Sequence, residues 1–398
     1  MIGAGAAGAQ TPRLSQSPRL AVRRLALTDF RCYGRLRLET DCRPVVLTGP
    51  NGAGKTNLLE ALSFLAPGRG LRRATLAEVA RQGAGPAAPW AVAAALDGPA
   101  GRMEIGTGRE AGSERRAVRI DGKPAKPGAL AALVSALWLT PAMDRLFIEG
   151  SGGRRRFLDR LTFGLEAGHA ASAAAYDHAM RERTRLLKAA RDGGRRPDPA
   201  WLAALEDGMA RHGVTMAAAR RRTVAALDEA CRGGIGPFPA ARLALAGEVE
   251  SWLDEAPPAE VEERVRGGLL RARARDEAAG AATQGPHRTD LAVRHAAKDL
   301  PAGQCSTGEQ KAVLVSIVLA QARVQTARRG TAPLLLLDEV VAHLDESRRT
   351  ALFDELAGLT AQSWMTGTDD VLFAGFGERA QFLRVADATV HPATREQP

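Results

Sequence analysis

The segment GPNGAGKTNLLEAL occupies residues 49–62 and follows the apolar run PVVLTG at residues 44–49. It matches the pattern G-x-x-x-x-G-K-[ST] in full, ending in Lys55 and Thr56. Glycine permits the tight turns that let successive backbone N–H groups converge on phosphate oxygens. Because a strand-like run precedes the loop and a helical pattern follows it, the segment predicts a nucleotide-binding site. The expected nucleotide contacts are Gly49, Pro50, Asn51, Gly52, Ala53, Gly54, Lys55 and Thr56.

A second apolar run, LLLL at residues 334–337, ends in Asp338 and Glu339. A continuous apolar run bounded by polar residues is typical of a parallel strand buried on both faces. We predict that Lys55 reaches the β- and γ-phosphates, that Thr56 and Asp338 hold Mg²⁺, and that Glu339 polarises the attacking water. The alternative for the two carboxylates is a helix cap at the end of the strand.

The bulk composition fits a large globular protein. The chain has 398 residues, of which 45% are hydrophobic and 25% are charged, so a sizeable core can form. No uncharged apolar run approaches the roughly 20 residues of a membrane span, and the start lacks a secretory signal. We therefore expect a cytoplasmic protein in which residues 1–21 form a disordered tail. The scattered cysteines argue against zinc and disulfides; they are Cys32, Cys42, Cys231 and Cys305.

The net charge of +10 suggests a nucleic-acid partner. The support is weak, because the many arginines beside only six lysines also fit GC-biased codon usage. Two basic clusters, GGRRRFLDR at 152–160 and ARRRTV at 219–224, are the candidate DNA-binding segments. Each cluster taken singly is more typical of a solvated helix face than of a DNA contact. The candidate DNA contacts are Arg154, Arg155, Arg156, Arg220, Arg221 and Arg222.

The order of patterns indicates an α/β fold divided by an insertion. Residues 22–151 combine short strands with the phosphate loop, and the turn DGK at 121–123 predicts a hairpin. Residues 152–282 read as helices rich in Arg and Ala, without sustained heptads. Residues 283–398 return to strands and carry Asp338. We expect a parallel-sheet phosphate-loop core with an antiparallel N-terminal subdomain and a helical arm.

The sequence STGEQK opens an apolar helix at residue 306. A hydroxyl and backbone N–H groups at a helix N-terminus suit an anion, although a simple N-cap by Ser306 with Glu309 explains the local pattern equally well. Co-occurrence with the phosphate loop and the LLLLDE strand resembles the head of ABC-type ATPases. That resemblance implies that the signature residues of one subunit contact nucleotide held by another; they are Ser306, Thr307, Gly308, Glu309 and Gln310. It also implies a D-loop at His343, Leu344 and Asp345.

The motifs resemble those of the RecF family of bacterial recombination mediators, in that family's order and over about residues 22–385. The matching segments are FRCYGRL, GRGLR, RRRFLD, GPHRTDL, STGEQK, LLLLDEVVAHLD and WMTGTD. The N-terminal tail departs from the family. The histidine expected after the acidic strand in ABC-type ATPases is replaced by TGTDD at 366–370, and Gln82 is only a candidate for the Q-loop glutamine. His287 is either a ligand contact or a structural histidine.

The resemblance implies ATP with Mg²⁺ as cofactor, and an ATP-dependent homodimer that closes on DNA at single-strand gaps or duplex junctions. It further implies RecO and RecR as partners, recombinase loading, SOS induction, and slow, DNA-stimulated hydrolysis. No residue can be assigned to the partner contacts. The alternatives are the ATP-binding subunit of a membrane transporter, which predicts a much shorter insertion, and an SMC-like structural linker, which needs long heptads.

Overall fold

The computed structural model describes residues 20–393 except 86, 194–196, 343 and 360. The centre of the head is a six-stranded sheet in the order β15-β14-β3-β13-β12-β8. Its five strands from β14 to β8 run parallel, and β15 pairs antiparallel at one edge. The strands are β3 (Val45–Thr48), β8 (Ala136–Leu139), β12 (Leu334–Leu337), β13 (Ser363–Gly367), β14 (Gln381–Ala386) and β15 (Thr389–Pro392).

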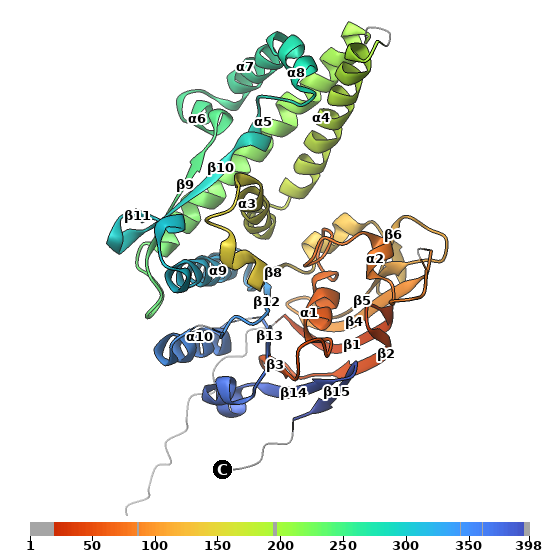
Figure 1. Ribbon diagram of the computed structural model, residues 1–398, viewed down its shortest axis with the longest axis vertical. Coiled ribbons are helices and arrows are strands. Elements are labelled where there is room, and N and C mark those ends of the chain that lie inside the picture. Colours follow the sequence, from red (N-terminus) through yellow and green to blue (C-terminus); the bar gives the residue numbers. More distant parts are fainter. Residues whose placement is uncertain (1–19, 86, 194–196, 343, 360, 394–398) are drawn as a thin grey trace, which may run out of the picture.

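Helices cover both faces of this sheet, which explains the uninterrupted apolar strands. All four leucines of β12 are buried, and every residue of β3 and β13 is buried as well. Figure 1 shows α9 (Thr307–Arg329) and α10 (Glu346–Gly358) on one side of the sheet and α1 (Lys55–Ser63) on the other. Ligands of such sheets bind beyond the carboxyl ends of the strands, where the phosphate loop and Asp338 both lie.

An antiparallel sheet forms the N-terminal lobe, in the order β2-β1-β4-β5-β6-β7. A cluster of aromatic rings from Phe30, Phe64 and Trp90 joins this sheet to the end of α1. The hairpin predicted at DGK is confirmed, because β6 pairs with β7 across Asp121 and Gly122, both with positive φ. The elements are β1 (Ala21–Phe30), β2 (Tyr33–Glu39), α2 (Leu76–Val79), β4 (Trp90–Gly98), β5 (Gly101–Arg109), β6 (Arg116–Ile120) and β7 (Lys123–Ala125).

The insertion forms an arm that projects from the head (Figure 1). Tyr176 and Leu187 on α4, with Leu202 and Met209 on α5, are buried at helical spacing. A cluster of buried apolar side chains that includes Tyr176 and Met209 forms a core of the arm's own, separate from that of the head. The helices are α3 (Ser151–Leu165), α4 (His169–Arg191), α5 (Pro199–Cys231), α6 (Glu248–Glu255), α7 (Pro258–Arg271) and α8 (Arg273–Ala279).

The insertion is not entirely helical. Strand β9 (Ala241–Ala246) pairs antiparallel with β10 (Asp290–His295), which also pairs with the two-residue β11 (Leu300–Pro301). This small sheet lies at the base of the arm (Figure 1). Short 3-10 turns complete the fold at Pro127–Ala132, Pro141–Arg145, Pro286–Arg288, Ala296–Lys298, Ala302–Gln304 and Val371–Arg379.

Leu20 is buried and bridges to Ala361, and β1 begins at Ala21, so the last two residues assigned to the tail belong to the folded lobe. The remaining tail residues, 1–19, lie outside the described residues. Within the described part of the chain, no helix combines the length and the apolar character that a membrane crossing needs.

Candidate nucleotide site and its basic surroundings

The phosphate loop depends on glycine at positions that no side chain could share. Gly49, Gly52 and Gly54 all have positive φ, which L-residues other than glycine rarely adopt. A Cβ at Gly49 would lie 2.1 Å from the Val385 carbonyl oxygen, and one at Gly54 would lie 2.6 Å from the Tyr33 hydroxyl. Helix α1 begins directly afterwards at Lys55, so its N-terminal N–H groups face the loop.

Lys55 is folded into the loop that it follows. Its Nζ donates to the carbonyl oxygens of Gly49 at 2.6 Å and Pro50 at 2.9 Å. Burial lowers the pKa of Lys55, while the carboxylates of Glu339 and Asp338 act in the opposite direction. The ammonium group is therefore held in the middle of the loop, with partners that it can exchange for phosphate oxygens.

Hydroxyl groups from two other elements converge on Asp338. Its Oδ1 accepts from Thr56 Oγ1 at 3.0 Å and from Thr366 Oγ1 at 2.7 Å. Mg²⁺ prefers oxygen ligands and is usually held by one or two carboxylates together with substrate phosphates. Among the described residues no group of three His, Cys, Asp or Glu side chains could hold a metal ion alone. The donor set of Thr56 and Asp338 fits a nucleotide-bound Mg²⁺.

Glu339 has a backbone conformation that is unusual for glutamate. Its φ is 50°, in the left-handed region, which costs on the order of 1–2 kcal/mol for a residue with a Cβ. Its N–H donates to Thr366 Oγ1 at 2.9 Å. Glu339 lines one cavity with Thr56 and Asp338.

The structure does not support Gln82 as the Q-loop residue. Gln82 is exposed on the antiparallel lobe, where its N–H donates to the Arg31 carbonyl, and it does not line the cavity that contains Asp338. Thr140 does line that cavity, because it follows β8, the neighbour of β12 in the parallel sheet. In the TGTDD segment, where ABC-type ATPases have a histidine, Thr366 donates a hydrogen bond to Asp338.

The signature segment forms the capping box that its sequence allows. Ser306 Oγ accepts from the Glu309 N–H, and the Glu309 carboxylate accepts from the Ser306 N–H at 3.1 Å. Ser306 and Thr307 are exposed, and Gly308 is half-buried. Gln310 is instead buried, and its Nε2 donates to the Cys305 carbonyl at 2.8 Å. Because the side chain is buried in its own subunit, a contact between subunits through it is not supported.

The segment after Glu339 is tied to the signature helix. Lys311 Nζ, on α9, donates to the carbonyl oxygens of Ala342 at 2.8 Å and Glu339 at 3.3 Å. In the expected D-loop, Leu344 is buried, and the Asp345 carboxylate caps α10 by accepting from the Arg348 N–H. His343 lies outside the described residues. A displacement of α9 would therefore act directly on the backbone beside Glu339.

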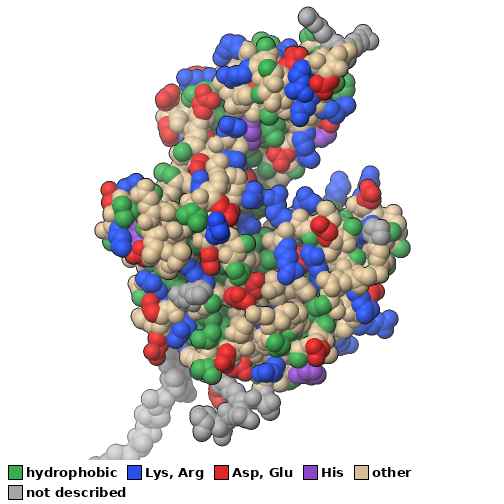
Figure 2. Space-filling model, viewed as in Figure 1, with side chains coloured by type: hydrophobic (Ala, Val, Ile, Leu, Met, Phe, Trp, Pro, Cys, Tyr) green, Lys and Arg blue, Asp and Glu red, His purple; other side chains and the backbone are tan. Residues whose placement is uncertain are grey.

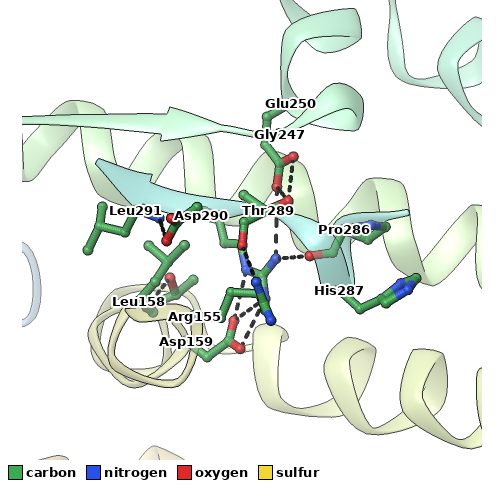
Figure 3. A network of polar contacts seen from close by, with 12 residues as sticks. Arg155, Leu158, Asp159, Gly247, Glu250, Pro286, His287, Thr289, Asp290 and Leu291 are labelled. Carbon is green, nitrogen blue, oxygen red and sulfur yellow. Dashed lines mark hydrogen bonds and ion pairs between the residues drawn. The ribbon is translucent and has the colours of Figure 1, made fainter. Parts of the chain in front are cut away.

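Most of the arginines predicted to contact DNA are engaged inside the molecule. Arg154 donates twice to Asp290, at 2.8 and 2.7 Å. Arg155 donates to the Thr289 carbonyl, and Arg220, 2% exposed, donates to Asp159 and to the Pro286 carbonyl. Figure 3 shows how this network joins α3 to the GPHRTD segment and to Glu250 of the arm. Arg154, Arg155 and Arg220 are therefore corrected to structural residues at the base of the arm.

The second basic cluster is also paired. Arg221 forms an ion pair with Asp254 and Arg222 one with Glu166, although both remain partly accessible. His287 is a structural histidine: its Nδ1 lies 2.7 Å from the Tyr176 hydroxyl and its Nε2 lies 3.0 Å from the Ala282 carbonyl. Burial lowers the pKa of His287, which favours the neutral ring. Of the six predicted contacts, Arg156 alone is exposed and without an ion pair among the described residues.

Arg156 belongs to a basic cluster that we define as Arg69, Arg73, Arg156 and Arg160. Arg73, Arg156 and Arg160 line a cavity of about 620 Å³ together with Thr56, Asp338 and Glu339. All four arginines line an adjoining cavity of about 380 Å³ between the loop after α1 and helices α3 and α4. Arg69 belongs to GRGLR, one of the segments that carry the family resemblance.

The four arginines repel one another. Burial, followed by the charges of Arg73 and Arg156, lowers the pKa of Arg160 to about 9. Burial and the charges of Arg156 and Arg69 also lower the pKa of Arg73, which Asp177 only partly offsets. No ion pair joins these four side chains to a carboxylate in the described part of the chain. Figure 2 shows Lys and Arg side chains gathered where the arm faces the antiparallel lobe. An anion bound between the four arginines would offset their repulsion.

A parallel sheet with a phosphate loop, an acidic strand and an intervening arm defines an ATPase head of the ABC and SMC class. The family model described as RecF/RecN/SMC N terminal domain matches residues 21–381, and the chain belongs to the RecF family. It is 53% identical to the DNA replication and repair protein RecF of Caulobacter vibrioides, over 92% of this chain and 96% of that protein. For the protein of the same name from Rhizobium meliloti the identity is 52%, over 92% and 97%.

Solved structures agree on the fold. The recombination mediator protein RecF-ATPrS in the RecFOR pathway superposes with a TM-score of 0.81 at 18% identity, over 95% of this chain and 99% of that one. A Smc head domain from Pyrococcus yayanosii gives 0.55 at 16% identity, over 94% and 97%. The predicted fold class and family are confirmed, and the comparisons do not favour the transporter alternative.

Proposed function

We propose that the chain is an ATP-dependent DNA-binding protein of replication and recombinational repair, in which ATP drives two heads together on DNA. The observation that carries this proposal is the shared cavity. Thr56, Asp338 and Glu339, which would surround the γ-phosphate, line the same cavity as Arg73, Arg156 and Arg160. A DNA phosphate held by the arginines would therefore lie close to the nucleotide.

The nucleotide half of the proposal assigns one role to each residue. Lys55 moves from the loop carbonyls to the phosphates, while the N–H groups of residues 49–56 hold the phosphate oxygens. Thr56 and Asp338 hold Mg²⁺, which would neutralise phosphate charge when bound. Glu339 orients the attacking water. Phosphoryl transfer requires mainly positioning and charge neutralisation, and this set supplies both.

The dimer half rests on where the signature residues lie. Ser306 and Thr307 are exposed at the start of α9, and none of the described residues between 306 and 310 lines the cavity that contains Asp338. The signature segment is thus free to meet the nucleotide of a second copy. Lys311 then connects that contact to the backbone of Glu339, which gives closure a route to hydrolysis.

The family relationship supports the remaining parts of the proposal. The relatives carry the name DNA replication and repair protein RecF, and we extend that role to this chain as a cytoplasmic mediator at single-strand gaps. RecO and RecR are the proposed partners, and recombinase loading and SOS induction are the proposed outcomes. Slow hydrolysis, stimulated weakly by DNA, follows if closure on DNA is the limiting event.

The DNA contact is tested by removing one basic-cavity arginine at a time. We expect Arg73→Ala and Arg156→Ala each to weaken ATP-dependent DNA binding equally for all sequences and to reduce the slope of log affinity against log salt by about 1. Arg102→Ala, an exposed arginine at the start of β5 outside both cavities, is the matched control. Fluorescence anisotropy at four salt concentrations measures the slopes. Unchanged slopes in both cavity variants would contradict this location for DNA.

Glu339→Gln should separate binding from turnover. The substitution keeps the size and the backbone of Glu339 and leaves Asp338 and Thr56 in place, so ATP affinity is expected to change less than threefold. Hydrolysis should fall by 10²-fold or more, since a positioned base commonly contributes 10²–10⁴. Phosphate release measures turnover, and light scattering measures the ATP-bound dimer that should accumulate. A variant that loses ATP affinity instead would show that Glu339 serves the metal or the fold.

A further inference from the structure

The hydroxyl of Thr366 lies between the two acidic residues of the site. It donates to Asp338 Oδ1 at 2.7 Å and accepts from the Glu339 N–H at 2.9 Å. Thr366 is fully buried in β13, which lies between β3 and β12 at the centre of the parallel sheet. A hydroxyl has one donor and two acceptor lone pairs, so its donor and one lone pair are committed to the consecutive residues Asp338 and Glu339.

We infer that Thr366 is a positioning residue, which sets the metal-binding orientation of Asp338 and holds Glu339 in its left-handed conformation. The inference rests on the Mg²⁺–ATP site proposed above. Asp338 Oδ1 accepts from Thr56 as well as from Thr366. When the Thr56 oxygen turns toward a cation, Thr366 still fixes the carboxylate. The carboxylate of Asp338 is therefore already oriented before a nucleotide binds.

The Glu339 contact carries the second half of the argument. A φ of 50° at Glu339 is unfavourable for a residue with a Cβ, so it persists only where the surroundings hold it. The bond from its N–H to Thr366 supplies such a restraint from the neighbouring strand. One side chain thus determines the direction of one carboxylate and the backbone from which the other extends.

A simpler reading is that Thr366 is a buried strand hydroxyl that happens to find partners. Ser363, on the same strand, shows that β13 does not require this: its Oγ is buried with no hydrogen-bond partner among the described residues. Removing that hydroxyl should therefore have no effect on the site. Ser363→Ala is the matched control for the loss of a buried hydroxyl from β13.

The experiment measures the coupling between Mg²⁺ and nucleotide, which is the ratio of affinities for a fluorescent, slowly hydrolysed ATP analogue in saturating Mg²⁺ and in EDTA. Residues that orient a metal ligand typically contribute 10- to 100-fold to metal affinity. We expect Thr366→Val and Thr366→Ala to reduce the coupling at least tenfold, with affinity in EDTA within twofold of wild type. Thr366→Ser keeps the hydroxyl, and Ser363→Ala leaves both partners of Thr366 intact, so each should retain the wild-type coupling.

Every other result overturns the inference. Wild-type coupling in the valine or alanine variant would show that Asp338 is positioned without Thr366. A loss of affinity in EDTA as well would show a role in folding, and a reduced coupling in Thr366→Ser or Ser363→Ala would assign the effect to packing. A wild-type protein that binds the analogue equally with and without Mg²⁺ would refute the metal site itself, which is a separate failure of the proposed function.

Discussion

Lys55→Ala should remove most of the stabilisation of the protein by nucleotide. At a concentration 100 times the dissociation constant, a ligand that binds only the folded state stabilises it by about 2.7 kcal/mol. Truncating one partner of a buried, charged contact costs about 2–5 kcal/mol. Even at the low end the dissociation constant would rise some 30-fold, to about a third of that nucleotide concentration. The gain would then fall to less than about 1 kcal/mol.

Thermal melting with and without Mg²⁺–ATP measures the stability of each protein and the stabilisation by nucleotide. Because Lys55 also donates to the carbonyls of Gly49 and Pro50, the variant should melt somewhat lower even without nucleotide, so only the shift on adding nucleotide is informative. Lys123→Ala removes an exposed lysine of the β6–β7 hairpin and should keep the full shift. An equal shift in Lys55→Ala would remove the basis for the nucleotide site.

The phosphate loop and the LLLL strand could be predicted from sequence because each depends mainly on its own contiguous residues. The loop from Gly49 to Thr56 is contiguous, and its glycines are required by backbone conformation and by close contacts. The LLLL strand is buried on both faces as its composition requires. In both segments the local residues themselves determine the structure. Strand β9 was not predicted, because it lies in a region dominated by helical patterns and its partner β10 lies beyond the predicted insertion.

The prediction of the DNA-contacting arginines failed for the opposite reason. The exposure of an arginine side chain depends on residues far away in sequence. Successive residues on a helix point about 100° apart, so Arg154, Arg155 and Arg156 cannot share one face of α3. Arg156 and Arg160, four residues apart, do share a face and line the basic cavities. Arg154 instead meets Asp290, 136 positions away. The run of three arginines therefore predicted one basic surface patch, but the helix places their side chains on different faces.

Thr366 was overlooked because nothing in its own segment marks it. Its partners lie 28 and 27 positions earlier, at Asp338 and Glu339, and they are reached only because β12 and β13 are parallel neighbours. In the pattern of ABC-type ATPases a histidine is expected where this sequence has TGTDD, at 366–370. In the structure, the hydroxyl of Thr366 on β13 forms hydrogen bonds with Asp338 and with the Glu339 N–H.

Ser306→Arg should prevent ATP-driven dimerisation while leaving nucleotide binding by the single subunit intact. In an isolated subunit, Ser306 only caps α9 through the bond from the Glu309 N–H, and losing that cap costs about 1 kcal/mol. In a closed dimer the same arginine would project toward the γ-phosphate side of the partner's site and block closure. Light scattering with and without ATP measures dimerisation, and anisotropy at one fixed low salt concentration measures DNA binding.

Ser306→Ala separates the two contributions, since it removes the same cap without adding bulk. Both variants should melt about equally below wild type in the absence of nucleotide. The alanine variant should retain a weakened dimer that still depends on ATP, whereas the arginine variant should remain monomeric, and its DNA affinity should no longer respond to ATP. Salt must be fixed because phosphate contacts weaken steeply as it rises. If Ser306→Arg still dimerises and still binds DNA in an ATP-dependent manner, Ser306 makes no contact between subunits, and the exposed start of α9 is only a helix cap.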